Sequence, residues 1–194
     1  VDTYTITVTG INNYTGSAQA TYTITPVSGG GGTGGGSTLV IDPIPAQIYT
    51  GSPITPTIDV TFNGLSVNST DYTVTYSANI NVGQATVIVE GNPGTNYANM
   101  VGTATFTINP KDITGTDIAV GAIPNQTYTG SAIEPEPTVT DNTRSTNLIL
   151  GADYILGYAG NVNVGTGTAT VTITGRGNYT GTREVYFNIT HANI

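Results

Sequence analysis

Residues able to do catalytic chemistry are few in this sequence. Cysteine is absent, and the one histidine, His191, follows the last apolar run without a neighbouring carboxylate. A histidine that acts as a general base needs an orienting partner within hydrogen-bond reach. Gly175-Arg176-Gly177 has the spacing of a phosphate loop, but a polar strand-like run follows it instead of a helix. The sequence therefore predicts a protein that is not an enzyme and carries no cofactor.

Acidic side chains suggest a second chemistry, the binding of calcium. Asp112 and Asp117 are the candidates, because they lie where two long repeat units join. Calcium prefers about six to eight oxygen ligands, often from several carboxylates, and no dense acidic run such as D-x-D-x-D is present. We therefore expect no metal site. Asp112 and Asp117 are instead expected to be solvated acidic residues of a loop.

Asparagine side chains provide a third candidate, the attachment of glycans. Sequons of the form Asn-x-Ser/Thr are frequent here, but threonine makes up roughly a fifth of the chain, so their number is close to chance. Asn13 and Asn178 lie in a repeated turn that we expect to be exposed. These two residues are the candidate acceptors.

The elements that must position these residues are strands. Only 8% of the residues are charged, against about 25% in an average soluble protein, while 12 Tyr and abundant Thr favour strands and 26 Gly punctuate them. A net charge of −8 with four basic residues argues against nucleic acid and anionic membranes as partners. No apolar run approaches the roughly 20 residues that would span a bilayer. The absence of cysteine fits an exported protein that avoids disulfides and equally a cytosolic one. Because no signal peptide is present, we expect a mature or excised segment.

A turn is repeated along the chain. The sequence Gly-x-x-Asn-Tyr-Thr-Gly at 175–181 recurs at 10–16 and, in looser form with an inserted Pro-Gly-Thr, at 91–97. Each copy lies between runs in which Thr alternates with apolar residues, as expected for a turn that joins two strands. The repeats therefore divide the chain into a hairpin at 1–27, a flexible glycine-rich linker at 28–38 and two full units at 39–110 and 111–194.

The two full units share one plan. Both open on Ile-Pro-x-Gln-x-Tyr-Thr-Gly, continue through Asn-x-Asn-Val-Gly and close on an alternating strand, and the second carries an extra loop at 142–147. About seven short strands in fewer than about 100 residues predict an all-β fold of two immunoglobulin-like sandwiches, with a barrel as the alternative. The predicted inward residues are Tyr72, Val74, Tyr76, Val87, Val89, Phe106 and Ile108, and in the second unit Tyr154, Leu156, Tyr158, Val171, Ile173, Phe187 and Ile189.

This pattern resembles the tandem immunoglobulin-like repeats of bacterial secreted and cell-surface proteins. The resemblance covers both full units and the hairpin, and the turn at 91–97 departs from it. It implies an extracellular location and a non-enzymatic role as a stalk, a spacer or part of an adhesin. Some surface immunoglobulin-like domains carry a lysine–asparagine isopeptide bond, which needs a buried lysine beside an acid. Lys111, the only lysine, is expected in the junction after Pro110, so no such bond is predicted, whereas an ester formed by a threonine stays open.

The hairpin at 1–27 bears most directly on function. Period two places Tyr4, Ile6, Val8, Tyr22 and Ile24 on one face, and a lone two-stranded hairpin is marginal in water. Either the hairpin is the closing half of a repeat cut from a longer array, or it completes a sheet in a neighbouring copy and builds a fibre. We expect partners to be copies of this protein or adjacent repeats. The alternative function is an adhesin or carbohydrate-binding module that uses exposed Tyr and Thr, in which case a glycan would be the ligand.

Overall fold

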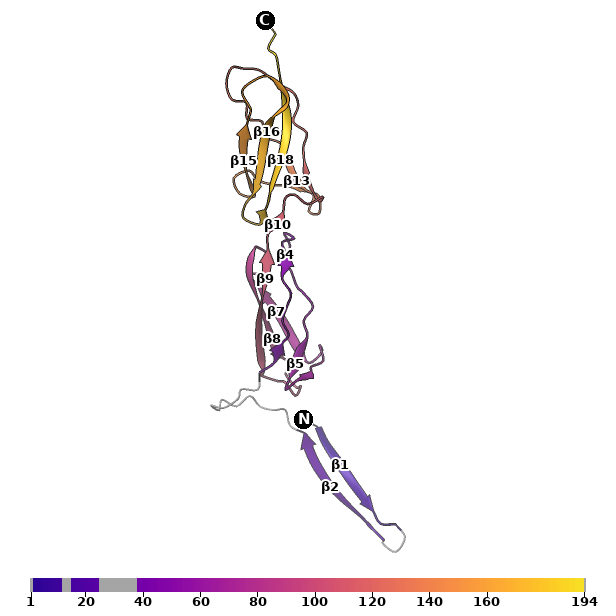
Figure 1. Ribbon diagram of the computed structural model, residues 1–194. Helices are drawn as coiled ribbons and strands as arrows, with labels where there is room; N and C mark the ends of the chain where they lie inside the picture. Colours follow the sequence, from indigo (N-terminus) through magenta and orange to yellow (C-terminus); the bar gives the residue numbers. More distant parts are fainter. Residues whose placement is uncertain (1, 12–14, 25–37, 194) are drawn as a thin grey trace. The chain divides into compact units, whose positions relative to one another are not determined.

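The computed structural model describes residues 2–11, 15–24 and 38–193, and these residues form strands, turns and irregular segments without a helix (Figure 1). The prediction of an all-β protein is confirmed. The predicted linker at 28–38, except for Thr38, and the candidate acceptor Asn13 lie outside the described residues.

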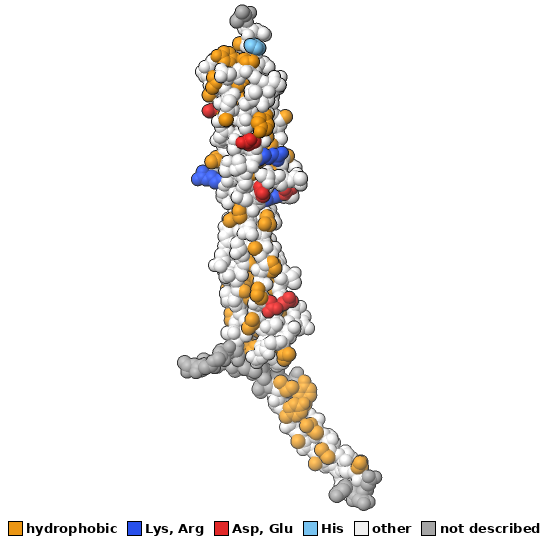
Figure 2. Space-filling view, in the orientation of Figure 1, with side chains coloured by type: hydrophobic (Ala, Val, Ile, Leu, Met, Phe, Trp, Pro, Cys, Tyr) orange, Lys and Arg blue, Asp and Glu red, His pale blue; other side chains and the backbone are white. Residues whose placement is uncertain are grey.

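The N-terminal strands form the predicted hairpin. β1 (Asp2–Thr9) and β2 (Ser17–Ile24) pair antiparallel, with Tyr4 opposite Tyr22 and Ile6 opposite Ala20. Residues directly opposite each other share a face, so the apolar side chains gather on one side and the Thr hydroxyls on the other. Hydrophobic side chains follow the length of this hairpin in Figure 2.

Residues 39–110 build two sheets. Asn63 and Gly64 have φ values of 50° and 78° in the turn between β5 and β6, as the Asn-Gly sequence predicts. The three-stranded sheet has the order β3 (Val40–Ile41), β5 (Val60–Phe62), β6 (Leu65–Ser66). The four-stranded sheet has the order β4 (Gln47–Ile48), β9 (Val101–Asn109), β8 (Gly83–Gly91), β7 (Tyr72–Ser77), with β4 parallel to β9.

Residues 111–190 repeat this plan. One sheet has the order β11 (Ile118–Val120), β13 (Val139–Asp141), β14 (Thr146–Asn147). The other has the order β12 (Gln126–Thr127), β18 (Thr182–Thr190), β16 (Gly165–Gly175), β15 (Tyr154–Ala159). In addition, β10 (Lys111–Asp112) pairs parallel with β17 (Tyr179–Thr180). Each of these sheets is open, with an edge strand at both ends, which is the arrangement of a sandwich and not of a closed barrel.

The core lies between sheets, as the alternating pattern predicts. Val60 of β5 and Val89 of β8 belong to one buried cluster that also contains Leu39, Val67 and Met100. The predicted inward tyrosines are buried or half-buried. Two of them reach a backbone carbonyl with the hydroxyl group, Tyr76 at Pro56 (2.6 Å) and Tyr158 at Pro135 (3.1 Å).

The chain separates into two compact units whose bounds differ from those of the sequence repeats. The segments 45–55 and 78–85, which precede the second repeat in sequence, belong to the same unit as that repeat. Unit 1 comprises Val1–Ile44, Pro56–Ser77 and Thr86–Phe106, and unit 2 comprises Pro45–Thr55, Ala78–Ala85 and Thr107–Ile194. All four Lys and Arg residues of the chain belong to unit 2.

Candidate functional site

A buried ion cluster lies in unit 2. Lys111 of β10 extends its ammonium group to Oδ1 of Asp141 (2.8 Å) at the end of β13 and to Oδ2 of Asp117 (2.5 Å) ahead of β11. The same ammonium donates to the hydroxyl of Thr143 (2.7 Å). Lys111 is 8% exposed and Asp141 is 0% exposed. Because a buried charge is tolerated only when it is paired and hydrogen-bonded, these contacts explain how the only lysine of the chain can be buried.

The carboxylate of Asp141 is saturated with donors. Besides Lys111, Oδ1 accepts from the backbone N–H of Thr143 (3.0 Å) and from its hydroxyl (2.6 Å), and Oδ2 accepts from the hydroxyl of Tyr179 (3.2 Å). Among the described residues, no buried side-chain nitrogen or oxygen lacks a hydrogen-bond partner. The cluster is therefore a complete polar network inside an otherwise apolar core.

Aromatic rings extend the cluster to the segment 45–55. Arg144 donates from its guanidinium to the hydroxyl of Tyr179 (2.9 Å) and lies over the ring of Tyr49, 5.5 Å from its centroid. The rings of Tyr49 and Tyr179 meet edge to face, with centroids 5.6 Å apart. Edge-to-face packing of the two rings and the position of the guanidinium over a ring face are both electrostatically favourable. Gly51 lies against the same guanidinium, and an added Cβ would clash with it.

Two features of this region were not expected from the sequence. Lys111 lies in the junction after Pro110, as predicted, but its side chain is buried, because β10 pairs with β17 and the ammonium group reaches Asp141. The turn at 175–181 is not wholly exposed, because Tyr179 is 2% exposed beneath Arg144 and beside Asp141. The signals in the sequence were the solitary lysine and the extra loop at 142–147, which supplies Arg144.

The charges of the cluster reinforce one another. Burial by itself would lower the pKa of Lys111, but the hydrogen bonds and negative charges of Asp117 and Asp141 outweigh it and raise that pKa. Burial would raise the pKa of Asp141, but Lys111, Thr143 and Tyr179 together lower it. Burial, with the neighbouring charge of Asp141, raises the pKa of Tyr179 to about 12. At neutral pH the cluster is an ion pair beside a neutral phenol.

This charge state bears on the isopeptide chemistry. Lys111 and Asp141 meet the geometric requirement of a buried lysine beside an acid. A lysine–asparagine bond would require a neutral amine to attack an asparagine amide with loss of ammonia, whereas the raised pKa keeps Lys111 charged and its ammonium group contacts Asp117, Asp141 and Thr143. The arrangement fits a structural ion pair.

Each of the two calcium candidates already has a partner. Asp117 is paired with Lys111, so an ammonium group already lies between Asp117 and Asp141. The Oδ1 of Asp112 accepts from the backbone N–H of Thr114 (2.8 Å), which lowers the pKa of Asp112. Within the described ranges, no group of three or more His, Cys, Asp or Glu side chains is placed to hold a metal ion.

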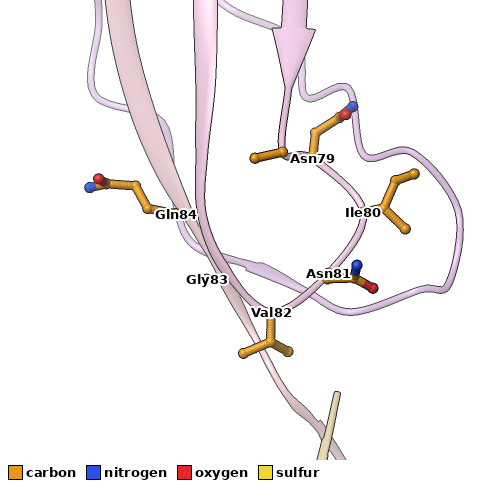
Figure 3. Close-up of a pocket in the computed structure, with 7 residues that line it drawn as sticks. Asn79, Ile80, Asn81, Val82, Gly83 and Gln84 are labelled. Carbon is orange, nitrogen blue, oxygen red and sulfur yellow. The ribbon is translucent and has the colours of Figure 1, made fainter. Parts of the chain in front are cut away.

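Asn178 makes two hydrogen bonds within unit 2. Its Oδ1 accepts from the backbone N–H of Val82 (2.9 Å), and its Nδ2 donates to Oδ1 of Asn81 (3.1 Å). A glycan would have to be attached at this bonded nitrogen. Asn81 and Val82 belong to a loop, residues 78–84, that surrounds a shallow hollow of about 300 Å³ (Figure 3). Asn79, Ile80 and Asn81 lie along the outer curve of that loop. The residues that line this hollow include no histidine, acid or base.

The hairpin forms a second candidate site, because its apolar face is uncovered. The predicted assembly residues Tyr4, Ile6, Val8, Tyr22 and Ile24 are between 44% and 65% exposed. The rings of Tyr4 and Tyr22 stack on each other, with centroids 5.5 Å apart.

The same hairpin is covered in unit 2. Aligning the turn at 10–16 with the turn at 175–181 gives a constant offset of 165 residues (175 − 10). With this offset, the pair Ile6 and Ala20 in the hairpin corresponds to the pair Val171 and Val185 in unit 2. The positions that correspond to the five assembly residues are 2% exposed or less. They are Ala169, Val171, Ile173, Phe187 and Ile189. The hairpin therefore has the register of a closing hairpin but lacks the cover that unit 2 provides.

Comparisons with known proteins add no family. No protein-family model matches the chain, and no curated protein matches it. Of the residues that the structure describes, none form a helix long and apolar enough to cross a membrane.

Replacing Lys111 by methionine should destabilise unit 2 strongly. The substitution keeps the length of the side chain but leaves Asp141 buried without its ammonium partner, so we expect a loss of about 3–5 kcal/mol in the free energy of unfolding. Chemical denaturation of the full chain measures it. The matched control is Asp117→Asn, because the side chain of Asp117 is 36% exposed and its loss should cost below about 1 kcal/mol. Equal losses for the two variants would contradict a buried, dominant Lys111–Asp141 pair.

The stability of unit 2 should also depend on pH at both extremes. Because its pKa is lowered, Asp141 contributes stability above the ordinary aspartate value of about 3.9 and loses it as the pH falls through the folded-state pKa. Because their pKa values are raised, Lys111 and Tyr179 contribute below about 10 and lose that contribution at higher pH, for Tyr179 up to about 12. Denaturation at a series of pH values should show a plateau between these limits. Tyr179→Phe should lessen the alkaline decline, and a main transition near neutral pH would be inconsistent with this assignment.

Proposed function

We propose that this chain is a non-enzymatic structural segment of a bacterial cell-surface or secreted protein, in which immunoglobulin-like repeats follow one another and the N-terminal hairpin joins neighbouring copies by β-strand complementation. The repeated plan of a three-stranded and a four-stranded sheet supports the immunoglobulin-like assignment. The extracellular location is inferred from the resemblance of the repeats to those of surface proteins.

One observation carries the proposal of assembly, namely the exposed apolar face of β1 and β2. Fully burying a Val, Leu, Ile or Phe side chain is worth about 1.5–3 kcal/mol, and five half-exposed side chains make the uncovered hairpin costly. Both strands are also sheet edges, with backbone groups free to pair outward. A partner that adds strands and covers the apolar face would relieve both costs.

The hairpin of a second copy is the partner that we propose. Both full repeats already contain their own closing strands, so neither offers an evident vacancy for β1 and β2. Another hairpin has the same alternation, and two such apolar faces can cover each other. The alternative is a spacer that does not assemble, with the hairpin completed by a neighbouring repeat of a longer array.

A second candidate function is the binding of carbohydrate, which the stacked pair of Tyr4 and Tyr22 favours. Both rings are about half exposed on one face of the hairpin, and aromatic rings stack on sugars.

Charges placed on the apolar face of β1 should abolish self-association. We expect the wild-type chain to form oligomers or filaments as its concentration rises, and Ile6→Lys with Val8→Lys to remain monomeric, because buried lysines would lack partners. The control is Thr5→Lys with Thr7→Lys, which adds the same charge to the opposite face of the same strand. Sedimentation velocity and electron microscopy measure the outcome. If the wild-type chain stays monomeric at every concentration, assembly is refuted and the spacer hypothesis remains.

Carbohydrate binding predicts a different result on a glycan array. The wild-type chain should bind a defined set of glycans, and Tyr22→Ala should remove that binding because half of the stacked pair is lost. Tyr186→Ala serves as the control, since Tyr186 is also exposed but its hydroxyl contacts Glu184. An array without bound glycans, or equal loss for both variants, rules this candidate out.

A further inference from the structure

Unit 2 contains two surfaces that share a sequence pattern and a backbone framework. The first version consists of Tyr49 and the loop 79–83, and we call it the covered surface. The second consists of Tyr128 and the loop 161–165, and we call it the open surface. Both loops have the sequence Asn-x-Asn-Val-Gly, and both tyrosines precede Thr-Gly-Ser.

Backbone contacts fix the two tyrosines in the same way. The N–H of Tyr49 donates to the carbonyl of Asn109 (2.9 Å), and the N–H of Tyr128 donates to the carbonyl of Thr190 (2.9 Å). The following Thr-Gly-Ser turns also match, because each threonine hydroxyl donates to the serine carbonyl two residues later at 3.2 Å.

Hydrogen bonds of the first asparagine hold each loop in place. Asn79 accepts at its carbonyl from the N–H of Ile54 (2.8 Å), and its Nδ2 donates to the carbonyl of Ile54 (3.0 Å). Asn161 makes the same two bonds with Ile133, at 2.9 and 3.1 Å. The two surfaces therefore have the same framework.

The covered surface is completed by a turn and an arginine from the second repeat. Asn178 bonds both Asn81 and Val82, Tyr179 meets the ring of Tyr49, and Arg144 lies over that ring. As a result, Tyr49 is only 7% exposed.

Among the described residues, no turn and no arginine makes the corresponding contacts at the open surface. Tyr128 is 40% exposed and Val164, the counterpart of Val82, is 38% exposed. A Cβ added to Gly130 would have no atom within 4 Å, whereas one added to Gly51 would clash with Arg144. The framework that receives a turn at the covered surface is therefore accessible at the open surface.

We propose that the open surface is the docking site of a further repeat, which supplies an Asn-Tyr turn and an arginine equivalent to Asn178, Tyr179 and Arg144. The amide of such an asparagine matches the N–H of a valine and the amide of a second asparagine, and the guanidinium matches an exposed tyrosine face. This inference deepens the proposed function and rests on it for the identity of the occupant as a repeat.

The occupant is a repeat connected covalently to the end of β18, in the way that Lys111 follows the end of β9 through Pro110. The contact at the covered surface consists of two asparagine hydrogen bonds, one edge-to-face tyrosine pair and one arginine over a tyrosine ring. A contact this small needs the high effective concentration that a short covalent connection provides.

An extended chain tests the proposal, made by adding a second copy of residues 110–190 directly after Thr190. In the unextended full chain, Tyr49→Ala should lower the unfolding temperature of unit 2 by roughly 10 °C or more, and Tyr128→Ala should change it by less than about 2 °C. In the extended chain, Tyr128→Ala should lower the unfolding temperature of the added repeat. The expected decrease is similar to the one that Tyr49→Ala causes in unit 2. An extended chain insensitive to Tyr128→Ala would overturn the proposal.

Cysteine pairs give a second readout, because the natural chain has no cysteine. In the extended chain, Asn163→Cys should form a disulfide with a cysteine at the added copy's equivalent of Asn178, detected by mass. The pair Asn81→Cys with Asn178→Cys is the control, and it reports that the existing contact and the fold are intact. If the control disulfide forms and the test disulfide does not, the proposal is overturned. Unextended chains that carry Asn163→Cys and Asn178→Cys provide a second check. A disulfide-linked dimer of these chains would also overturn the proposal, because the occupant would then be a separate chain. Self-association through the hairpin is measured separately, so its failure is distinguishable from the failure of docking.

Discussion

The structure depends on the need to cover the apolar face of each closing hairpin. Thr alternates with apolar residues along these strands, so every hairpin has one hydroxyl-rich face and one apolar face. In residues 39–110, Val60 from one sheet and Val89 from the other share a core. In unit 2, the corresponding positions of β16 and β18 are fully buried. The first hairpin has the same register but no such cover, and this difference is the basis of the proposed assembly.

The chain has few charged residues, and one group of them forms a buried cluster. In a chain with 8% charged residues, the only lysine is buried with Asp141 and contacts Asp117. A buried pair of this kind adds little net stability over an apolar core, but it rejects arrangements that leave either charge unpaired. Here it joins β10, β13 and the turn before β11, and Tyr179 connects it to Arg144 and Tyr49. The polar network thereby fixes the segment 45–55 within unit 2.

Local patterns predicted most of the fold. The alternating strands, the pairing of β1 with β2 and the turn at Asn63-Gly64 follow from period-two alternation and from positive φ, which are properties of neighbouring residues. The positions of Lys111, Tyr179 and Arg144 depend on which loops meet in space, and no local period encodes that. The irregular turn at 91–97 illustrates the difference, because Tyr97 packs edge-on against Phe62 (5.8 Å between centroids) while Tyr179 packs against Tyr49.

Assembly through the hairpin is the central claim of this account, and amide hydrogen exchange along β1 and β2 tests it most directly. A hairpin that pairs with a second copy should exchange slowly at high protein concentration and rapidly at low concentration, because its outward-facing amides are protected only by the partner. The strands of unit 2 serve as an internal reference, with protection independent of concentration. Rapid exchange of β1 and β2 at every concentration, beside a protected unit 2, would contradict the account.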